Sequence, residues 1–221
     1  IVITGDSATG KTTLSKYLKN ALNNSFILEC DRYHKWERGN ENWKNFTHLN
    51  PEANYLTKMR NDVFDLKIGK NIYQVDYDHS NGKFTDKILI ESADNIIVTG
   101  LHTLYNENNL SNLNIYMDTS DSLKIPWKIN RDMKKRNHDL YKIIESIESR
   151  KEDYYKYIVP QKDNADIIIM LYTNDIFNMN ELDNYNPTIL LSIGILNSFN
   201  MSKILSLLEK YKFTISYKDK F

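Results

Sequence analysis

The sequence predicts an α/β fold in three layers, with a mostly parallel central sheet and helices on both faces. Two observations predict it. Short runs rich in Ile, Val and Leu alternate with longer amphipathic runs along the 221 residues, which is the pattern of successive strand–helix–strand units. The strand-like runs are almost continuously apolar, as expected for strands that are covered on both faces.

Seven runs are predicted as strands and five as helices. The strand candidates are residues 1–4, 26–30, 96–99, 114–117, 167–171, 189–193 and 213–217. The helix candidates are residues 11–22, 52–66, 121–135, 141–158 and 201–210, where apolar residues recur every three or four positions. Turn residues at 80–82 predict a hairpin within 73–91, and the Asn-rich stretch 174–186 predicts a loop. We expect one domain over residues 1–221, to which residues 187–221 add a strand, a helix and a strand.

Composition narrows the possible partners and the compartment. The 29 basic and 29 acidic residues cancel, so the net charge favours neither a nucleic-acid nor a membrane-surface partner. No apolar run reaches the ~18 residues that a transmembrane helix needs. A single cysteine, Cys30, excludes an internal disulfide and fits a reducing compartment. We therefore expect a cytoplasmic protein.

The first strand candidate leads into a phosphate-binding motif. Residues 5–12 read Gly-Asp-Ser-Ala-Thr-Gly-Lys-Thr and fit the P-loop pattern G-x-x-x-x-G-K-[ST]. Glycines allow the backbone amides to curl around phosphate oxygens, and the next helix directs its N-terminus at them. Lys11 would reach the β- and γ-phosphates, and the Thr12 hydroxyl would ligate Mg²⁺. The predicted site for a nucleoside triphosphate, taken as ATP, comprises Gly5, Asp6, Ser7, Ala8, Thr9, Gly10, Lys11, Thr12 and Thr13.

A P-loop alone does not separate kinases from GTPases or motor proteins. The residues that end the second strand candidate help to distinguish these classes. It ends in Cys-Asp-Arg-Tyr-His at residues 30–34, with Arg38 just beyond. The carboxyl ends of strands in such sheets line the ligand crevice, which places Asp31 where an acceptor hydroxyl would lie. Taken alone, an Asp at a strand end is more often a turn or helix cap.

One predicted helix has a basic face. Lys124, Lys128, Arg131 and Lys135 follow one another at spacings of four, three and four residues, which is one side of a helix. Phosphoryl transfer places charge on the oxygens of the transferred group, and cations stabilise that charge. We interpret the face as directed at the triphosphate. A solvated basic face is the alternative.

Several segments resemble the phosphoribulokinase/uridine kinase family, in order from residue 1 to about residue 171. They are residues 29–34 (ECDRYH), 47–54 (THLNPEAN), 77–82 (YDHSNG), 100–105 (GLHTLY), 124–133 (KIPWKINRDM) and 160–166 (PQKDNAD). Residues 48–54, 100–105 and 127–133 look closer to phosphoribulokinases than to uridine kinases. The resemblance implies a kinase that uses ATP and Mg²⁺ and phosphorylates a hydroxyl of a pentose phosphate or similar sugar phosphate.

The resemblance also implies roles for individual residues. Asp31 matches the catalytic base. The residues that match substrate-binding positions are His34, Arg38, Arg136 and His102. The residues that match the charged catalytic cluster are Lys128, Arg131 and Asp132, which act together with Lys11. Arg150 matches an arginine that lies near the nucleotide in the lid of the family's enzymes. A cluster of cations favours an anionic acceptor. A uridine or cytidine kinase, and a regulatory nucleotide-binding protein with little turnover, are the alternatives.

The chain departs from the resemblance in two places. The third strand candidate should end in an acid that supports Mg²⁺, but Thr99 occupies that position. We expect either that Asp6 or Asp132 supplies the charge or that activity is low. The tail from residue 187 has no counterpart in the resemblance and is a candidate for homodimer contacts or for a partner domain.

Overall fold

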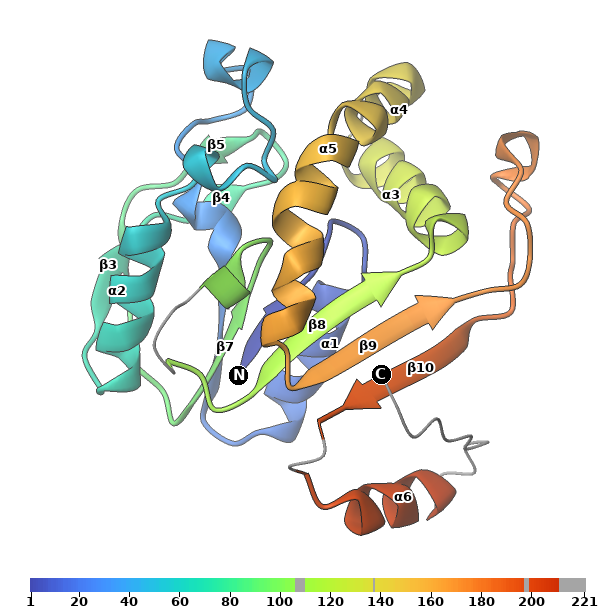
Figure 1. The fold of residues 1–221 in the computed structure, drawn as a ribbon. Coiled ribbons are helices and arrows are strands. Elements are labelled where there is room, and N and C mark those ends of the chain that lie inside the picture. Colours follow the sequence, from blue (N-terminus) through green and yellow to red (C-terminus); the bar gives the residue numbers. More distant parts are fainter. Residues whose placement is uncertain (106–109, 137, 197–198, 211–221) are drawn as a thin grey trace.

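The computed structural model describes residues 1–105, 110–136, 138–196 and 199–210. Within them, a six-stranded sheet has the order β10-β9-β8-β1-β7-β2 (Figure 1). Its strands are β1 (Val2–Thr4), β2 (Ser25–Glu29), β7 (Asn95–Thr99), β8 (Asn114–Thr119), β9 (Ile167–Tyr172) and β10 (Leu190–Ile195). Neighbours are parallel except for β10, which runs antiparallel to β9. The predicted mostly parallel sheet is confirmed.

The helices are α1 (Lys11–Ala21), α2 (Leu56–Lys67), α3 (Asp121–Arg136), α4 (Leu140–Ser149), α5 (Lys151–Asp153) and α6 (Met201–Lys210). The second helix starts at Leu56 rather than at residue 52, because Pro51–Ala53 forms a separate 3-10 turn. The Asn50 side chain accepts a hydrogen bond from the backbone N–H of Glu52 and caps that turn. The strand predicted at 213–217 lies outside the described residues.

Alternate residues of the central strands pack on opposite faces of the sheet. Ile3 and Ile97 belong to a core that α1 completes with Leu14, Leu18 and Leu22. Val2 and Val98 belong to the other core, with Met59, Val63 and Leu66 of α2. This alternation explains why the strands read as continuously apolar.

The prediction that every strand is covered on both faces was wrong for β9 and β10. Met170, Leu191 and Ile193 are exposed. Their strands lie at one edge of the sheet, whereas α1 packs on β1, β2 and β7. None of the helices in the described ranges is both long and apolar enough to cross a membrane.

The predicted hairpin is confirmed and contains two paired segments. β3 (Ile72–Gln74) pairs with β6 (Ile88–Ile90), and β4 (Tyr77–Asp78) pairs with β5 (Lys83–Phe84), all antiparallel. The backbone N–H of Arg38 donates to the Gly82 carbonyl at 2.8 Å. The tip of the hairpin is therefore held beside the segment that follows β2.

The helix predicted as continuous over residues 141–158 is interrupted, and that prediction was wrong. It stops at Ser149, turns at Arg150 and continues as α5, a π-helix (Tyr154–Ile158) and a 3-10 helix (Val159–Asn164). Pro160 has no backbone N–H to donate to the preceding turn, so the α-helical bonding pattern cannot run through it. π-helical turns such as the one at Tyr154–Ile158 occur often at functional sites.

Candidate active site

The P-loop joins β1 to α1 and requires glycine at its first position. Gly5 has a φ of 139°, and a Cβ there would lie 2.1 Å from the carbonyl oxygen of Met117. Gly10, directly before α1, has a φ of 92°. Thr9 Oγ1 donates a hydrogen bond to the Asp6 carbonyl at 2.8 Å. The loop is thus folded as a cradle before the N-terminus of α1, where backbone amides can bind an anion.

Lys11 is folded back onto this cradle. Its ammonium group donates to the carbonyl oxygens of Gly5 at 2.8 Å and Asp6 at 2.5 Å. Burial lowers the pKa of Lys11 to about 8, while the charges of Asp6 and Asp31 act in the opposite direction. Phosphate oxygens are stronger partners for an ammonium than carbonyl oxygens, so the arrangement suits a lysine that exchanges partners on nucleotide binding.

The basic face of α3 is directed at the P-loop, as the helical spacing indicated. Lys124 Nζ lies 3.5 Å from Asp6 Oδ2. Arg131 Nη2 donates to Ser7 Oγ at 3.0 Å. The alternative of a purely solvated basic face is wrong for these two residues, and the side chain of Lys135 lies outside what the structure describes.

Asp132 organises three cations on α3. Its carboxylate is 2% exposed and lies 2.9 Å from Lys128 Nζ, 2.8 Å from Arg131 Nε and 3.3 Å from Arg136 Nη1. Burial acts to raise the pKa of Asp132. The hydrogen bond from Arg131 and the charge of Lys128 outweigh it, so that pKa lies well below its usual range. The carboxylate therefore stays ionised and fixes the directions of its partners.

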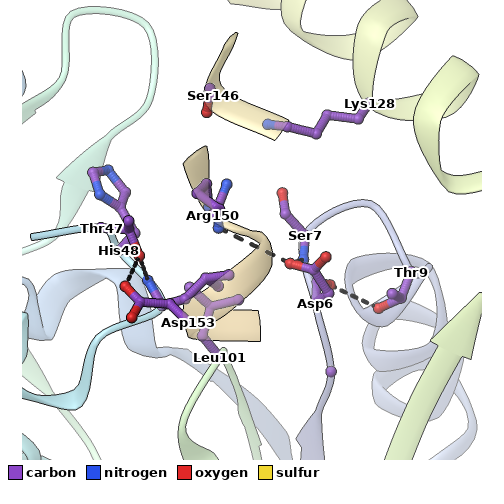
Figure 2. A network of polar contacts seen from close by, with 12 residues as sticks. Asp6, Ser7, Thr9, Thr47, His48, Leu101, Lys128, Ser146, Arg150 and Asp153 are labelled. Atoms are coloured by element: carbon purple, nitrogen blue, oxygen red, sulfur yellow. Dashed lines mark hydrogen bonds and ion pairs between the residues drawn. The ribbon is translucent and has the colours of Figure 1, made fainter. Parts of the chain in front are cut away.

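Lys128 and Arg150 face a cavity beside the P-loop. Burial, and then the charge of Arg150, lower the pKa of Lys128 to about 8. Arg150 Nη2 lies 4.0 Å from Asp6 Oδ1 (Figure 2), and its buried Nε has no hydrogen-bond partner within the described residues. The cavity has about 630 Å³ of empty space, part of it open to solvent, and is also lined by Lys124 and Tyr154. Its cations and unused donor suit phosphate oxygens.

Asp31 lies in the 3-10 turn that follows β2, at the carboxyl edge of the sheet. Its Oδ2 is 3.1 Å from His79 Nε2, and its Oδ1 is 3.7 Å from His34 Nε2. Burial acts to raise the pKa of Asp31. The hydrogen bond from His79 and the nearby charges of His34 and Lys11 outweigh it, and the pKa lies well below its usual range. Asp31 is therefore an ionised acceptor on the side of the cradle where Lys11 lies.

Three of the residues expected on the substrate side lie near Asp31: Arg136 and Arg38 contact His79, and His34 lies near Asp31 itself. Arg136 Nη2 lies 3.3 Å from His79 Nδ1, and Arg38 Nη2 donates to the His79 carbonyl at 2.7 Å. His34 is 4% exposed, and its Nδ1 lies 2.8 Å from Asn54 Oδ1. Sequence reasoning gave no role to His79. The resembling segment 77–82 and its turn were the available signals, but they did not show that the hairpin folds back onto Asp31.

His102 lies behind this group and does not face open solvent. It is 3% exposed, and its Nε2 lies 3.3 Å from the His48 carbonyl. Burial lowers the pKa of His102 to about 4, so the ring is neutral near pH 7. It lines a small cavity together with Asp31 and His34. Direct contact of His102 with an acceptor stays a prediction.

The family model described as Phosphoribulokinase / Uridine kinase family matches residues 1–176. The chain belongs to the phosphoribulokinase/uridine kinase family. It is 35% identical over 175 residues to a phosphoribulokinase of Synechocystis sp. and 41% identical over 147 residues to the chloroplastic phosphoribulokinase of Chlamydomonas reinhardtii. These matches cover 77% and 66% of this chain but 53% and 39% of the two relatives. The chain thus spans about half of those proteins or less.

A solved structure of a phosphoribulokinase from Rhodobacter spheroides has the same fold. The two superpose with a TM-score of 0.70 at 20% identity, over 94% of this chain and 84% of the other. The match supports the three-layer fold with a P-loop that the sequence predicted. The roles given to individual residues of this family member remain predictions.

Thr99 ends β7 where the family resemblance implied an acid. It is 5% exposed. The expectation that Asp6 or Asp132 supplies the missing charge stays a prediction, and both carboxylates already have cationic partners. Asp6 pairs with Lys124 and Arg150, and Asp132 is surrounded by its three cations.

The donor set near the cradle suits a metal that arrives with a nucleotide. Within the described ranges, no group of three or more His, Cys, Asp or Glu side chains is arranged to hold a metal ion. Thr12 is exposed in the first turn of α1 and offers a hydroxyl. Mg²⁺ in such sites commonly takes one or two protein oxygens and completes its shell with phosphate and water. The residues present fit that mode of binding.

Proposed function

We propose that this chain is an ATP-dependent kinase that transfers the γ-phosphoryl group to a hydroxyl of a pentose phosphate or a similar sugar phosphate. One observation carries the proposal. The ionised Asp31 lies near Lys11 of the phosphate cradle, and His79 links it to Arg136. A base, a phosphate cradle and cations for a second anion are thus gathered at one edge of the sheet.

The donor side would bind ATP through the P-loop. Lys11 would leave the carbonyl oxygens of Gly5 and Asp6 for the β- and γ-phosphates. Lys128, Arg131 and Arg150 would stabilise the charge on the transferred group, which is the largest contribution that a protein makes to phosphoryl transfer. Asp132 would keep two of these cations in place before ATP binds.

The acceptor side would hold a hydroxyl against Asp31. The carboxylate would orient that hydroxyl toward the γ-phosphorus and take its proton late in the transfer. Arg38 and Arg136, joined through His79, would bind the phosphate of the acceptor. Paired guanidinium groups are well suited to phosphate and have no evident use beside a neutral nucleoside.

Mg²⁺ would be held by the Thr12 hydroxyl and by nucleotide oxygens. When bound, it would neutralise charge on the β- and γ-phosphates. The protein's own part is to keep the Thr12 hydroxyl exposed in the first turn of α1, next to the cradle.

The test is ATP turnover with a panel of acceptors: ribulose 5-phosphate, other pentose phosphates, uridine and cytidine. We expect turnover with at least one pentose phosphate and little with the nucleosides. Turnover with uridine or cytidine alone would replace this proposal with a nucleoside kinase. Tight nucleotide binding without turnover on any acceptor would point to a regulatory protein.

A further inference from the structure

Glu29 and Thr99 lie side by side at the carboxyl edge of the sheet. Glu29 is paired in register with Thr99, and Thr99 is paired in register with Ile3 of β1. Paired residues of neighbouring parallel strands present their side chains on the same face, and residues two apart along a strand share a face. Thr99 therefore shares the face of Ile97, and Glu29 shares the face of Ile27, in the core that α1 covers.

This face is the one from which the P-loop helix starts. α1 packs against β1, β2 and β7, and its first turn contains Thr12. Side chains at the carboxyl ends of these strands consequently point toward the N-terminal side of α1. Neighbouring strands are roughly 4.8 Å apart. A glutamate on β2 can span that distance and bring its carboxylate to the region that an acid at position 99 would serve.

The other acids near the cradle already have hydrogen-bond or ion-pair partners. Asp6 lies against Lys124 and Arg150, Asp31 accepts a hydrogen bond from His79, and Asp132 holds three cations. Glu29 differs from them. It is half-buried, and within the described ranges its carboxylate has no hydrogen bond and no ion pair. A half-buried carboxylate without a cation, beside a site built for polyphosphate, is suited to a cation that enters with the nucleotide.

We infer that Glu29 is the carboxylate that supports Mg²⁺ in this protein, one strand away from Thr99. It would hold the metal directly or through a water molecule, and the Thr12 hydroxyl would be a second ligand of the same ion. Thr99 contributes at most a neutral hydroxyl. This inference rests on the proposed function, because it requires that the cradle bind a nucleotide together with a divalent cation.

The test measures metal binding and does not depend on turnover. Mn²⁺ is titrated into the protein with a non-hydrolysable ATP analogue, and free Mn²⁺ is read by electron paramagnetic resonance. Glu29→Gln keeps the size and removes the charge, and we expect Mn²⁺ affinity of the complex to fall by about 10–100-fold. Affinity for the analogue without metal should not fall, because the lost carboxylate repels the polyphosphate. Glu91→Gln, an exposed position directly after β6, is the matched control and should bind Mn²⁺ like the parent.

A second variant keeps the charge and moves it. Glu29→Gln combined with Thr99→Glu should regain most of the lost Mn²⁺ affinity, with thermal unfolding showing that both variants are folded. Unchanged Mn²⁺ affinity in Glu29→Gln, or a double variant as weak as the single one, would overturn the inference. A parent protein that binds the analogue neither with nor without metal would overturn the proposed function and this inference with it, so the two failures are distinguishable.

Discussion

His79 Nε2 lies 3.1 Å from Asp31 Oδ2, and His79 Nδ1 lies 3.3 Å from Arg136 Nη2. Arg136 only donates hydrogen bonds, and the ionised Asp31 only accepts them. A His79 ring that donates from Nε2 and accepts at Nδ1 fits both contacts. A side chain from the inserted hairpin therefore orients a carboxylate at the end of β2 and links it to α3.

The first prediction separates the chemistry of Asp31 from binding. Asp31→Asn keeps the size of the side chain and one acceptor oxygen but cannot take the acceptor's proton. We expect kcat to fall by about 10²–10⁴-fold, the usual range for loss of a general base. KM for the acceptor should stay within several-fold of the parent value. Steady-state kinetics on the acceptor that the panel identifies provides the measurement.

The control is nucleotide affinity, which should be unchanged in Asp31→Asn because the cradle is formed by other residues. His34→Ala and Arg38→Ala should instead raise the acceptor KM most. Parental turnover by Asp31→Asn would reduce Asp31 to a residue that shapes the turn after β2.

The second prediction concerns His79 and pH. The hydrogen bond from His79 helps to hold the pKa of Asp31 well below its usual range, so the parent base stays ionised throughout the accessible acid range. His79→Ala removes that bond while burial continues to raise the pKa. The pKa of Asp31 should then rise, and an acid limb should enter the profile of kcat/KM at a higher pH than in the parent. Activity lost at low pH should return as pH rises through that limb.

The matched control is Lys83→Ala, an exposed change in the same hairpin, which should keep the parental profile. If His79→Ala lowers activity equally at every pH, His79 acts on binding or folding and not on the ionisation of Asp31.

The fold was largely predictable because its signals are local. An apolar strand, a glycine-rich turn and an amphipathic helix follow one another in residues 1–22, and the structure reproduces that order. The break at Arg150 was missed because helical spacing persists on both sides of it. The exposure of Leu191 and Ile193 was missed for another reason: coverage of a strand depends on where the helices pack, and a strand's own apolar pattern does not report that.

The half of the candidate site at the P-loop was predictable, and the half around Asp31 only partly. Lys11 belongs to a contiguous motif whose backbone geometry is nearly dictated by its glycines. Asp31 and His79 are far apart in sequence and meet only because the hairpin folds back over the end of β2. The pairing of Asp6 with Lys124 and Arg150 likewise depends on the packing of three separate elements, so sequence spacing could not predict it.

The third prediction concerns Lys11. Burial lowers its pKa to about 8, so the ammonium form that binds phosphate predominates below that pH and is lost above it. We expect nucleotide affinity to hold from about pH 7 to 8 and then to fall by up to about tenfold per pH unit. Lys11→Ala should bind weakly at every pH and lose this dependence. Fluorescence titration with labelled ADP measures both effects.

Folding provides the control for Lys11→Ala. A lysine whose pKa is lowered on folding binds fewer protons in the native state than in the unfolded one, so its burial costs stability near neutral pH and less as pH rises. Without nucleotide, Lys11→Ala should therefore keep a Tm no lower than that of the parent. Lys19→Ala, in the last turn of α1, should leave both affinity and Tm unchanged. Parental nucleotide binding by Lys11→Ala would contradict the P-loop interpretation.

The last prediction concerns the hydrogen bond between Thr47 and Asp153 of α5. Thr47 Oγ1 donates to Asp153 Oδ2 at 2.6 Å and accepts from the Leu49 backbone N–H at 3.1 Å. Asp153 is the last residue of α5, the short helix that directly follows Arg150. Figure 2 shows Arg150 between the Thr47–Asp153 pair and Asp6 of the P-loop. The Thr47 segment also leads to Asn54, whose side chain contacts His34 at 2.8 Å. The hydrogen bond therefore joins the helix that follows Arg150 to the segment from Thr47 to Asn54.

Thr47→Val keeps the shape of the side chain and removes the donor. A hydrogen bond to a charged group contributes about 1.5–3 kcal/mol, so we expect Tm to fall by about 3–10 °C. We also expect a higher acceptor KM, because the segment that carries Asn54 loses its anchor. Thr47→Ser retains the hydroxyl and should behave like the parent. A double-mutant cycle with Asp153→Asn isolates the pair, since the two single losses should add to clearly more than the loss in the double variant. Additive losses would mean that Thr47 and Asp153 act separately and that their hydrogen bond does not couple α5 to the Thr47 segment.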